Sequence, residues 1–409
     1  MLTKNKNKNK NGIIYLLIAY WVVLVAWQNI SNATARTGFD TFLKAGLLVA
    51  FCIFFLNASK LKLNLNIVLI FFIAVSLLIT FILNESITLY SIISYFYPIV
   101  FMICVYGLGG NLTINKKQLL IFLNCIIAVV LYMVIYALIF KTSQFTTALR
   151  LNTAYGHELS SFLTSNHEYG LYLSMAIISS IICYDLKYDK PLKQKWFYIV
   201  VICLFLINLL LTFSRTSMLG AGIALIIYCI FGKKSFLKNI LLILGLIAIV
   251  LIFTVSDLRD FFFKIVLKDG NLAGRDDLTD LAIYKFNNAN VLQKLFGYGD
   301  TDIRLFFTNK LAHSSIHNAY LQILLSYGLI PLICLIVFLI YNIFYCFKLC
   351  KYNKFIGVLF LAIVLFGIAI MFTNTTILFM SPIDSYFLTI FVVVLPKYVG
   401  NTIIKKEFD

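Results

Sequence analysis

The chain has 409 residues, of which 61% are hydrophobic and 12% charged, and its mean hydropathy is +0.94. Soluble proteins carry about 25% charged residues, so this composition excludes an ordinary soluble protein and indicates a polytopic membrane protein. The formal net charge of +17 does not point to a nucleic-acid partner, because basic residues on cytoplasmic loops orient membrane helices.

Apolar runs recur along the whole chain. A spanning helix needs about 20 apolar residues, and the sequence predicts an all-α protein of about twelve such helices in one membrane domain over residues 1–409. The predicted spans are 13–30, 41–57, 65–83, 87–108, 118–140, 166–184, 196–213, 217–231, 238–256, 318–346, 355–373 and 377–395. The first run follows four lysines, as in a signal peptide, but its length favours an uncleaved helix.

Basic residues divide unequally between the two sides that alternating spans define. With both termini in the cytoplasm, the inner segments hold 21 of the 34 basic residues, and all 21 are lysine. Every arginine and every histidine falls on the outer side: Arg36, Arg150, Arg215, Arg259, Arg275, Arg304, His157, His167, His313 and His317. Arginine binds phosphate in bidentate fashion and histidine transfers protons near neutral pH. We therefore expect chemistry on the external face, although so few residues could sort this way by chance.

A long external loop, residues 257–317, separates the ninth and tenth predicted spans. It begins with an amphipathic stretch around Phe261 and Phe262 that is typical of a segment lying on a membrane surface. A helix is predicted after Gly274, where apolar residues recur from Leu278 at helical spacing. Glycines after the following segment suit a helix stop. The loop is therefore predicted to fold onto the helical bundle and to form part of an active site.

The first candidate site element is Ser214-Arg215-Thr216, between two apolar runs at the outer surface. An arginine near hydrocarbon is costly, so it either extends into lipid headgroups or binds a phosphate with the help of neighbouring hydroxyls. Gly220 and Gly222 follow on the same predicted helix and would allow a neighbouring helix to pack closely.

The second candidate element opens the tenth predicted span. His313 and His317 are four residues apart and would share one helix face. That spacing suits a metal, but no third ligand is evident, and the sequence predicts neither a metal nor a cofactor. The remaining readings are a general base and a hydrogen-bonded capping histidine. Asn318 and Gln322 are one turn apart and would orient a sugar or the imidazole.

Two further candidates lie elsewhere in the chain. Arg275 precedes Asp276 and Asp277, so it either forms a surface salt bridge or binds an anion. Asn166 and His167 begin the sixth predicted span and would face the same pocket as the second element. Nucleotide-binding and zinc-protease motifs are absent from the sequence, and charged residues are rare within the predicted spans, which disfavours an ion-coupled transporter.

The order of these elements resembles the O-antigen ligase and polymerase family of bacterial envelope glycosyltransferases. The resemblance covers roughly the second half of the chain. One departure is Pro331, where members of the family often continue with glycine. The matching elements are Ser214-Arg215-Thr216, Gly274-Arg275, Gly297-Tyr298-Gly299, and His317-Asn318 followed by Leu321 and Gly328.

The resemblance implies a membrane enzyme that uses undecaprenyl-diphosphate-linked glycans at the outer leaflet of the cytoplasmic membrane. It implies that Arg215 and Arg275 hold the pyrophosphate and that His317 acts as base on the acceptor hydroxyl, with polysaccharide-assembly proteins as possible partners. We expect a polymerase that joins lipid-linked repeat units. A ligase that transfers a glycan to another acceptor is the alternative, and a polysaccharide-lipid transporter is the alternative of another class.

Overall fold

The computed structural model consists of helices and turns in the residues that it describes. These are residues 65–84, 95–96, 99–101, 103, 112–149, 158–163, 165–187, 191–256, 259, 263, 275–311, 316–374, 378, 385, 388–406 and 408, and no strand occurs among them. The predicted spans 13–30 and 41–57, most of 87–108 and the predicted surface stretch around Phe261 lie outside the described residues.

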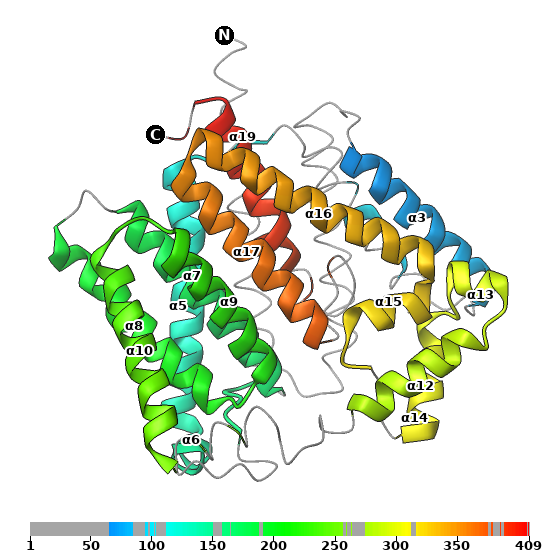
Figure 1. The fold of residues 1–409 in the computed structure, drawn as a ribbon, viewed down its shortest axis with the longest axis horizontal. Coiled ribbons are helices and arrows are strands. Elements are labelled where there is room, and N and C mark those ends of the chain that lie inside the picture. The colour runs from blue at the N-terminus through cyan, green and yellow to red at the C-terminus, as the bar shows by residue number, and fades with distance from the viewer. Residues whose placement is uncertain are drawn as a thin grey trace.

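One group of helices occupies the left of Figure 1. Its central member, α7, is buried along almost its whole length and packs against α5, α8 and α9. A helix that is buried on every side has apolar residues on all its faces, so its sequence shows no single apolar stripe. In this group, helices occur at five of the predicted spans, to within four residues at each end: α5 (Lys116–Phe140), α7 (Asn166–Leu186), α8 (Leu192–Leu211), α9 (Arg215–Phe231) and α10 (Phe236–Thr254).

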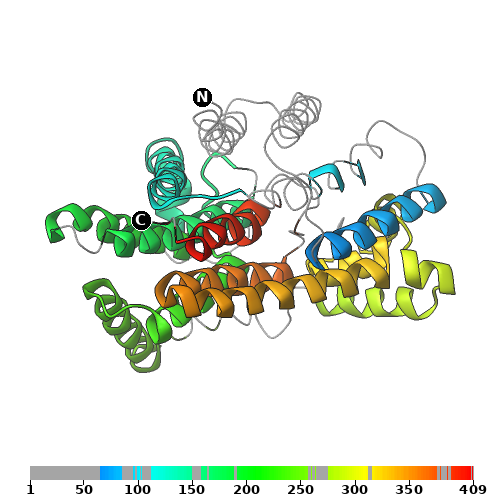
Figure 2. The ribbon, with the colours of Figure 1, turned by 90° about the horizontal axis from the view of Figure 1, so that it is seen from above.

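A pair of helices, α16 (Leu329–Tyr352) and α17 (Lys354–Thr373), connects this group to the rest of the protein. Figure 2 shows the pair, in orange, extending from the green helices to the yellow loop helices. α17 packs closely along α9, and α3 (Leu65–Asn84) packs along α16. Gly220 makes the first of these contacts possible, since a Cβ there would lie 2.9 Å from the Phe366 ring. Gly222 faces open space, so its predicted packing role is wrong.

The predicted span 318–346 is not one helix. The chain forms a short helix, α15 (Ala319–Tyr327), breaks at Gly328 and restarts as α16. Gly328 has φ +91°, a conformation that residues with a Cβ rarely adopt. The absence of a side chain also lets it lie against the backbone of Leu295 and Phe296. Pro331 lies in the first turn of α16, where backbone N–H groups have no partner within the helix, so its lack of an N–H breaks no helical hydrogen bond.

The described part of the predicted external loop forms helices that pack onto the bundle. Within it lie α12 (Arg275–Asn287), α13 (Val291–Phe296) and α14 (Asp300–Leu311), and all three contact α15. A small separate core joins them to α15, and it contains Leu278, Ala282, Ile303, Phe307, Ile316 and Leu325. The Gly297-Tyr298-Gly299 segment is fixed to α15 by backbone hydrogen bonds, from Tyr298 N to Leu325 O at 2.8 Å and from Gly299 N to Ser326 O at 3.0 Å.

Two other segments differ from the prediction. Residues 141–165, which lie between two of the predicted spans, begin with the short helix α6 (Thr142–Leu149). The last predicted span, 377–395, ends too early, because the π-helical turn Ile390–Val394 continues into α19 (Leu395–Ile404). Pro396 is the second residue of α19, in the first turn, where a helix tolerates a proline.

Helix length and composition support a multi-pass membrane protein. In the described part of the chain, five helices are long and apolar enough to span a bilayer, namely α3, α5, α7, α16 and α17, and four shorter apolar helices accompany them. The total of twelve spans and their orientation remain predictions.

The lysine-rich helix ends gather at one end of the bundle. There the segment before α5 bonds to α19, with Ile114 N donating to Tyr398 O at 3.2 Å and Thr402 Oγ1 donating to Ile114 O at 2.7 Å. Figure 1 shows α19 and the α16–α17 turn at this end, at the top, while the starts of α7 and α9 and the end of α17 lie at the opposite end.

Candidate functional site

The Ser214-Arg215-Thr216 element forms the start of α9. Ser214 is fully buried at the N-cap position, and Arg215 is the first helical residue. The preceding Phe213 has φ +50°, which turns the chain sharply between α8 and α9. The first N–H groups of a helix carry partial positive charge and attract anions. This element therefore combines a guanidinium group with a helix N-terminus at one place.

His167 lies next to this element. Its Nδ1 is 3.1 Å from Ser214 Oγ, and the Ser214 hydroxyl donates in turn to Ser217 Oγ at 3.0 Å. In that arrangement Ser214 Oγ accepts the proton of His167 Nδ1. The neighbouring Asn166 donates from Nδ2 to Thr212 O at 3.0 Å. Side chains at the start of α7 thus bond to residues that precede Arg215 in sequence, and Ser217, which follows Arg215, bonds to His167 O.

Gly170 permits this close approach of α7 to α9. A Cβ at this position would lie 2.7 Å from Ser217 Oγ and 3.0 Å from Ser214 Cβ. Gly170 was not among the predicted site residues, although a glycine inside an apolar helix is a recognised sign of close backbone packing.

The last turns of α17 connect α9 with α15. Thr216 Oγ1 donates to Thr373 O at 3.1 Å, which joins the start of α9 to the end of α17. Tyr320 OH donates to Ile368 O at 3.4 Å, and the Tyr320 and Phe372 rings are 6.4 Å apart. Figure 1 shows the start of α15 beside the end of α17. The arginine and histidine elements, about a hundred residues apart in sequence, therefore lie at the same end of the molecule.

Tyr320 joins two helices at this position. Its hydroxyl donates a proton to Ile368 O, and this hydrogen bond holds α15 against α17.

His317 precedes α15 and is not part of a helix. Its φ is +54°, in the left-handed region that few residues with a side chain occupy. Its neighbours hold it there, since Ile316 is buried in the loop core and Ala319 is buried at the start of α15. The predicted shared helix face of His313 and His317 is therefore wrong at His317, and His313 lies outside the described residues.

Asn318 is the N-cap of α15. Its side-chain oxygen accepts hydrogen bonds from Tyr320 N at 3.0 Å and Leu321 N at 3.2 Å. An asparagine cap of this kind contributes about 1 kcal/mol to helix stability. The bond fixes the first turn of α15, and with it the position of the residue immediately before the cap, His317.

Gln322 is buried and connects α15 to the external loop. Its Nε2 donates to Ser326 Oγ at 3.0 Å and to Asp300 Oδ1 at 3.4 Å. Asp300 is also paired with Arg304, whose Nε is 2.8 Å from Oδ2. Gln322 was predicted to orient a sugar or the imidazole, but in the structure its amide nitrogen anchors α15 to the loop residue Asp300. Neither Asp300 as a partner of Gln322 nor the pairing of Asp300 with Arg304 was predicted.

Arg275 is the first residue of α12, and only its backbone is described. The helix that it begins packs against α15 through Leu278 and Ala282, which share a core with Leu325. The fold therefore places the backbone of Arg275 in the same group of loop helices that packs beside His317.

These features define a multi-pass α-helical membrane protein whose sequence motifs converge at one end of the bundle. Residues 199–336 match the family model described as O-antigen ligase, which confirms the resemblance to the O-antigen ligase and polymerase family. The matched region contains Arg215, Arg275, His317 and the whole external loop. The family consists of membrane enzymes that transfer glycosyl groups. No curated protein matches the chain in sequence.

Proposed function

We propose that this protein is a glycosyltransferase that joins undecaprenyl-diphosphate-linked oligosaccharide repeat units on the outer face of the cytoplasmic membrane. The observation that carries the proposal is the convergence of two elements on the last turns of α17. Arg215 is held there through Thr216 and Thr373, and His317 is held there through the α15 residue Tyr320. A cation at a helix N-terminus and a histidine at the same end of the molecule suit displacement of a lipid diphosphate by a sugar hydroxyl.

In this reaction the acceptor oxygen forms a bond to the anomeric carbon of the donor. The bond from that carbon to the diphosphate oxygen breaks, and the lipid diphosphate leaves with the bonding electron pair. His317 takes the proton of the attacking hydroxyl, since an imidazole with a pKa near 6.5 can act as a base at neutral pH. Direct attack inverts the configuration at the anomeric carbon.

The negative charge that grows on the leaving diphosphate needs fixed positive groups. Arg215 and Arg275 are assigned to this charge, because a guanidinium offers paired N–H donors to phosphate oxygens. The first N–H groups of α9 add positive potential for the diphosphate, since the Ser214 side chain makes no capping bond to them.

A ligase that transfers a finished glycan to a different acceptor is the second candidate. The description of the matching family, O-antigen ligase, favours it. A transporter is disfavoured by the distribution of charge. In the five long described helices, Asp, Glu, Lys and Arg occur only towards the ends, whereas coupled transporters place such groups near the membrane midplane.

Reconstitution with a lipid-linked oligosaccharide tests the proposal. A ladder of products identifies a polymerase, a single transfer identifies a ligase, and movement across the membrane without new bonds rejects both.

Replacement of His317 tests its assignment. His317→Gly suits the positive φ and removes only the imidazole, so the variant is expected to fold and to lose transfer. Full activity of folded His317→Gly protein would reject His317 as the base.

Replacement of Arg215 tests the phosphate contact. Arg215→Lys keeps the charge but loses the forked donors, so weaker donor binding is expected. Unchanged donor affinity would remove Arg215 from that role.

A further inference from the structure

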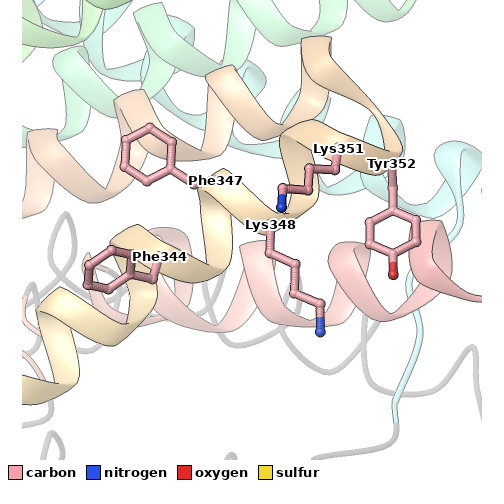
Figure 3. Close-up of a pocket in the computed structure, with 5 residues that line it drawn as sticks. All are labelled: Phe344, Phe347, Lys348, Lys351 and Tyr352. Carbon is pink, nitrogen blue, oxygen red and sulfur yellow. The ribbon is translucent and has the colours of Figure 1, made fainter.

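A surface pocket lies far from the candidate site, at the lysine-rich end of the bundle. It has a volume of about 580 Å³ and is lined by Phe344, Phe347, Lys348, Lys351 and Tyr352, all from the last turns of α16. Figure 3 shows the two phenylalanine rings on one side of it and the lysine ammonium groups and tyrosine hydroxyl on the other. The pocket is therefore apolar at one end and cationic at the other.

The apolar end continues a stripe along α16. The exposed apolar side chains of this helix recur at helical spacing and lead from its start to the pocket: Ile333, Ile336, Val337, Ile340, Phe344 and Phe347. A spanning helix presents such a stripe to lipid acyl chains. Phe344 and Phe347 remain 66% and 51% exposed, so they are accessible to a molecule that lies along the stripe.

The two pocket lysines differ from other lysines at this end of the bundle. Lys238 donates to Ile230 O and Gly232 O, and Lys187 and Lys195 lie over tyrosine rings. Lys348 and Lys351 are exposed, and they form no ion pair or hydrogen bond with the described residues. Their positive charge is available to an external anion.

We propose that this pocket binds the phosphate headgroup of an anionic phospholipid, with its acyl chains along the exposed stripe of α16. Charge and shape both favour this occupant. Two ammonium groups match a phosphodiester, the aromatic rings match the first carbons of the acyl chains, and Tyr352 supplies a polar aromatic group at the interface level. A zwitterionic lipid has the same chains but no net charge, so it would bind more weakly.

Site-specific cross-linking tests the proposal in the full-length protein. Tyr352→p-benzoylphenylalanine places a photoreactive group in the pocket, and Ile333→p-benzoylphenylalanine places one on the same stripe near the other end of α16. Both proteins are reconstituted in vesicles of equal phosphatidylglycerol and phosphatidylcholine with identical acyl chains. The ratio of the two cross-linked lipids is then measured by mass spectrometry.

Enrichment of phosphatidylglycerol on the order of ten-fold is expected at position 352 relative to position 333, because each interfacial lysine favours an anionic lipid several-fold. Adding Lys348→Gln and Lys351→Gln should abolish the enrichment. Lys405→Gln and Lys406→Gln, which remove an exposed lysine pair at the end of α19, should leave it unchanged.

Three outcomes would overturn the proposal. The lipid ratio could be equal at positions 352 and 333, or the enrichment could survive loss of both pocket lysines. Cross-linking of position 352 to a protein segment in place of lipid would identify an acidic polypeptide as the occupant.

Discussion

Replacing Gly170 with alanine tests the packing that joins the starts of α7 and α9. The new methyl group would lie 2.7 Å from Ser217 Oγ, 2.9 Å from Ser217 Cβ and 3.0 Å from Ser214 Cβ. Real Cβ contacts are longer than this, so the two helices must separate or rotate. Overpacking of this kind costs about 1–3 kcal/mol, against a gain of up to about 1 kcal/mol from the better helix propensity of alanine.

Thermal unfolding in detergent measures the effect. A net loss of about 1–2 kcal/mol corresponds to a fall in Tm of roughly 1–3 °C for a protein of this size. Gly222→Ala is the matched control, because a Cβ at Gly222 meets nothing within 4 Å. The control should leave Tm unchanged or raise it slightly. Glycan transfer should also fall in Gly170→Ala, since the His167–Ser214 contact beside Arg215 is disturbed.

A double-mutant cycle makes the explanation specific. Ser217→Gly removes the two atoms nearest to the new methyl group, so Gly170→Ala should cost less in that background by about 1 kcal/mol. The packing argument fails if Gly170→Ala has the Tm of the unmodified protein, or if Gly222→Ala lowers Tm by the same amount. An additive cycle would show that the cost arises elsewhere than at Ser217.

Three further predictions concern the candidate site. Ser214→Ala removes a buried hydroxyl between His167 and Ser217, so a loss of about 1–3 kcal/mol in the free energy of unfolding is expected. The KM for the lipid-linked donor should rise, and an unchanged KM would contradict the coupling of Ser214 to Arg215. Asn318→Ala removes the cap of α15 and should lower kcat. Asn318→Ser keeps a capping oxygen and should have a kcat close to that of the unmodified protein. A kcat as low in Asn318→Ser as in Asn318→Ala would indicate a direct contact between Asn318 and substrate. Transfer should survive EDTA, because the proposal assigns charge stabilisation to arginines, and loss that a divalent cation restores would refute that assignment.

The sequence alone was sufficient to identify the class of protein and most helix positions in the described part of the chain. Apolar runs of about 20 residues can be satisfied in a bilayer only as helices, so α5, α7 and α17 were predictable from composition and length. The external loop helix α12 was predictable as well, because Leu278 and Ala282 recur at helical spacing and bury one face.

Helix breaks were harder to predict. Gly328 interrupts an apolar run that reads as continuous, and glycine occurs both inside spanning helices and at their ends. Its positive φ depends on the Gly297 segment that packs against it from the external loop. The same long-range contact determines that α15 is a separate short helix.

The candidate site was predictable as residue types and not as an arrangement. Arg215, Arg275 and His317 stand out because arginine and histidine suit phosphate binding and proton transfer. Their convergence depends on contacts between distant segments, such as Thr216 with Thr373 and Tyr320 with Ile368. No local pattern encodes such pairs. The sequence therefore determined the membrane class and the chemical groups. Tertiary packing alone decided that α17 brings the starts of α9 and α15 to one end of the bundle, and that His317 lies in a left-handed turn before α15.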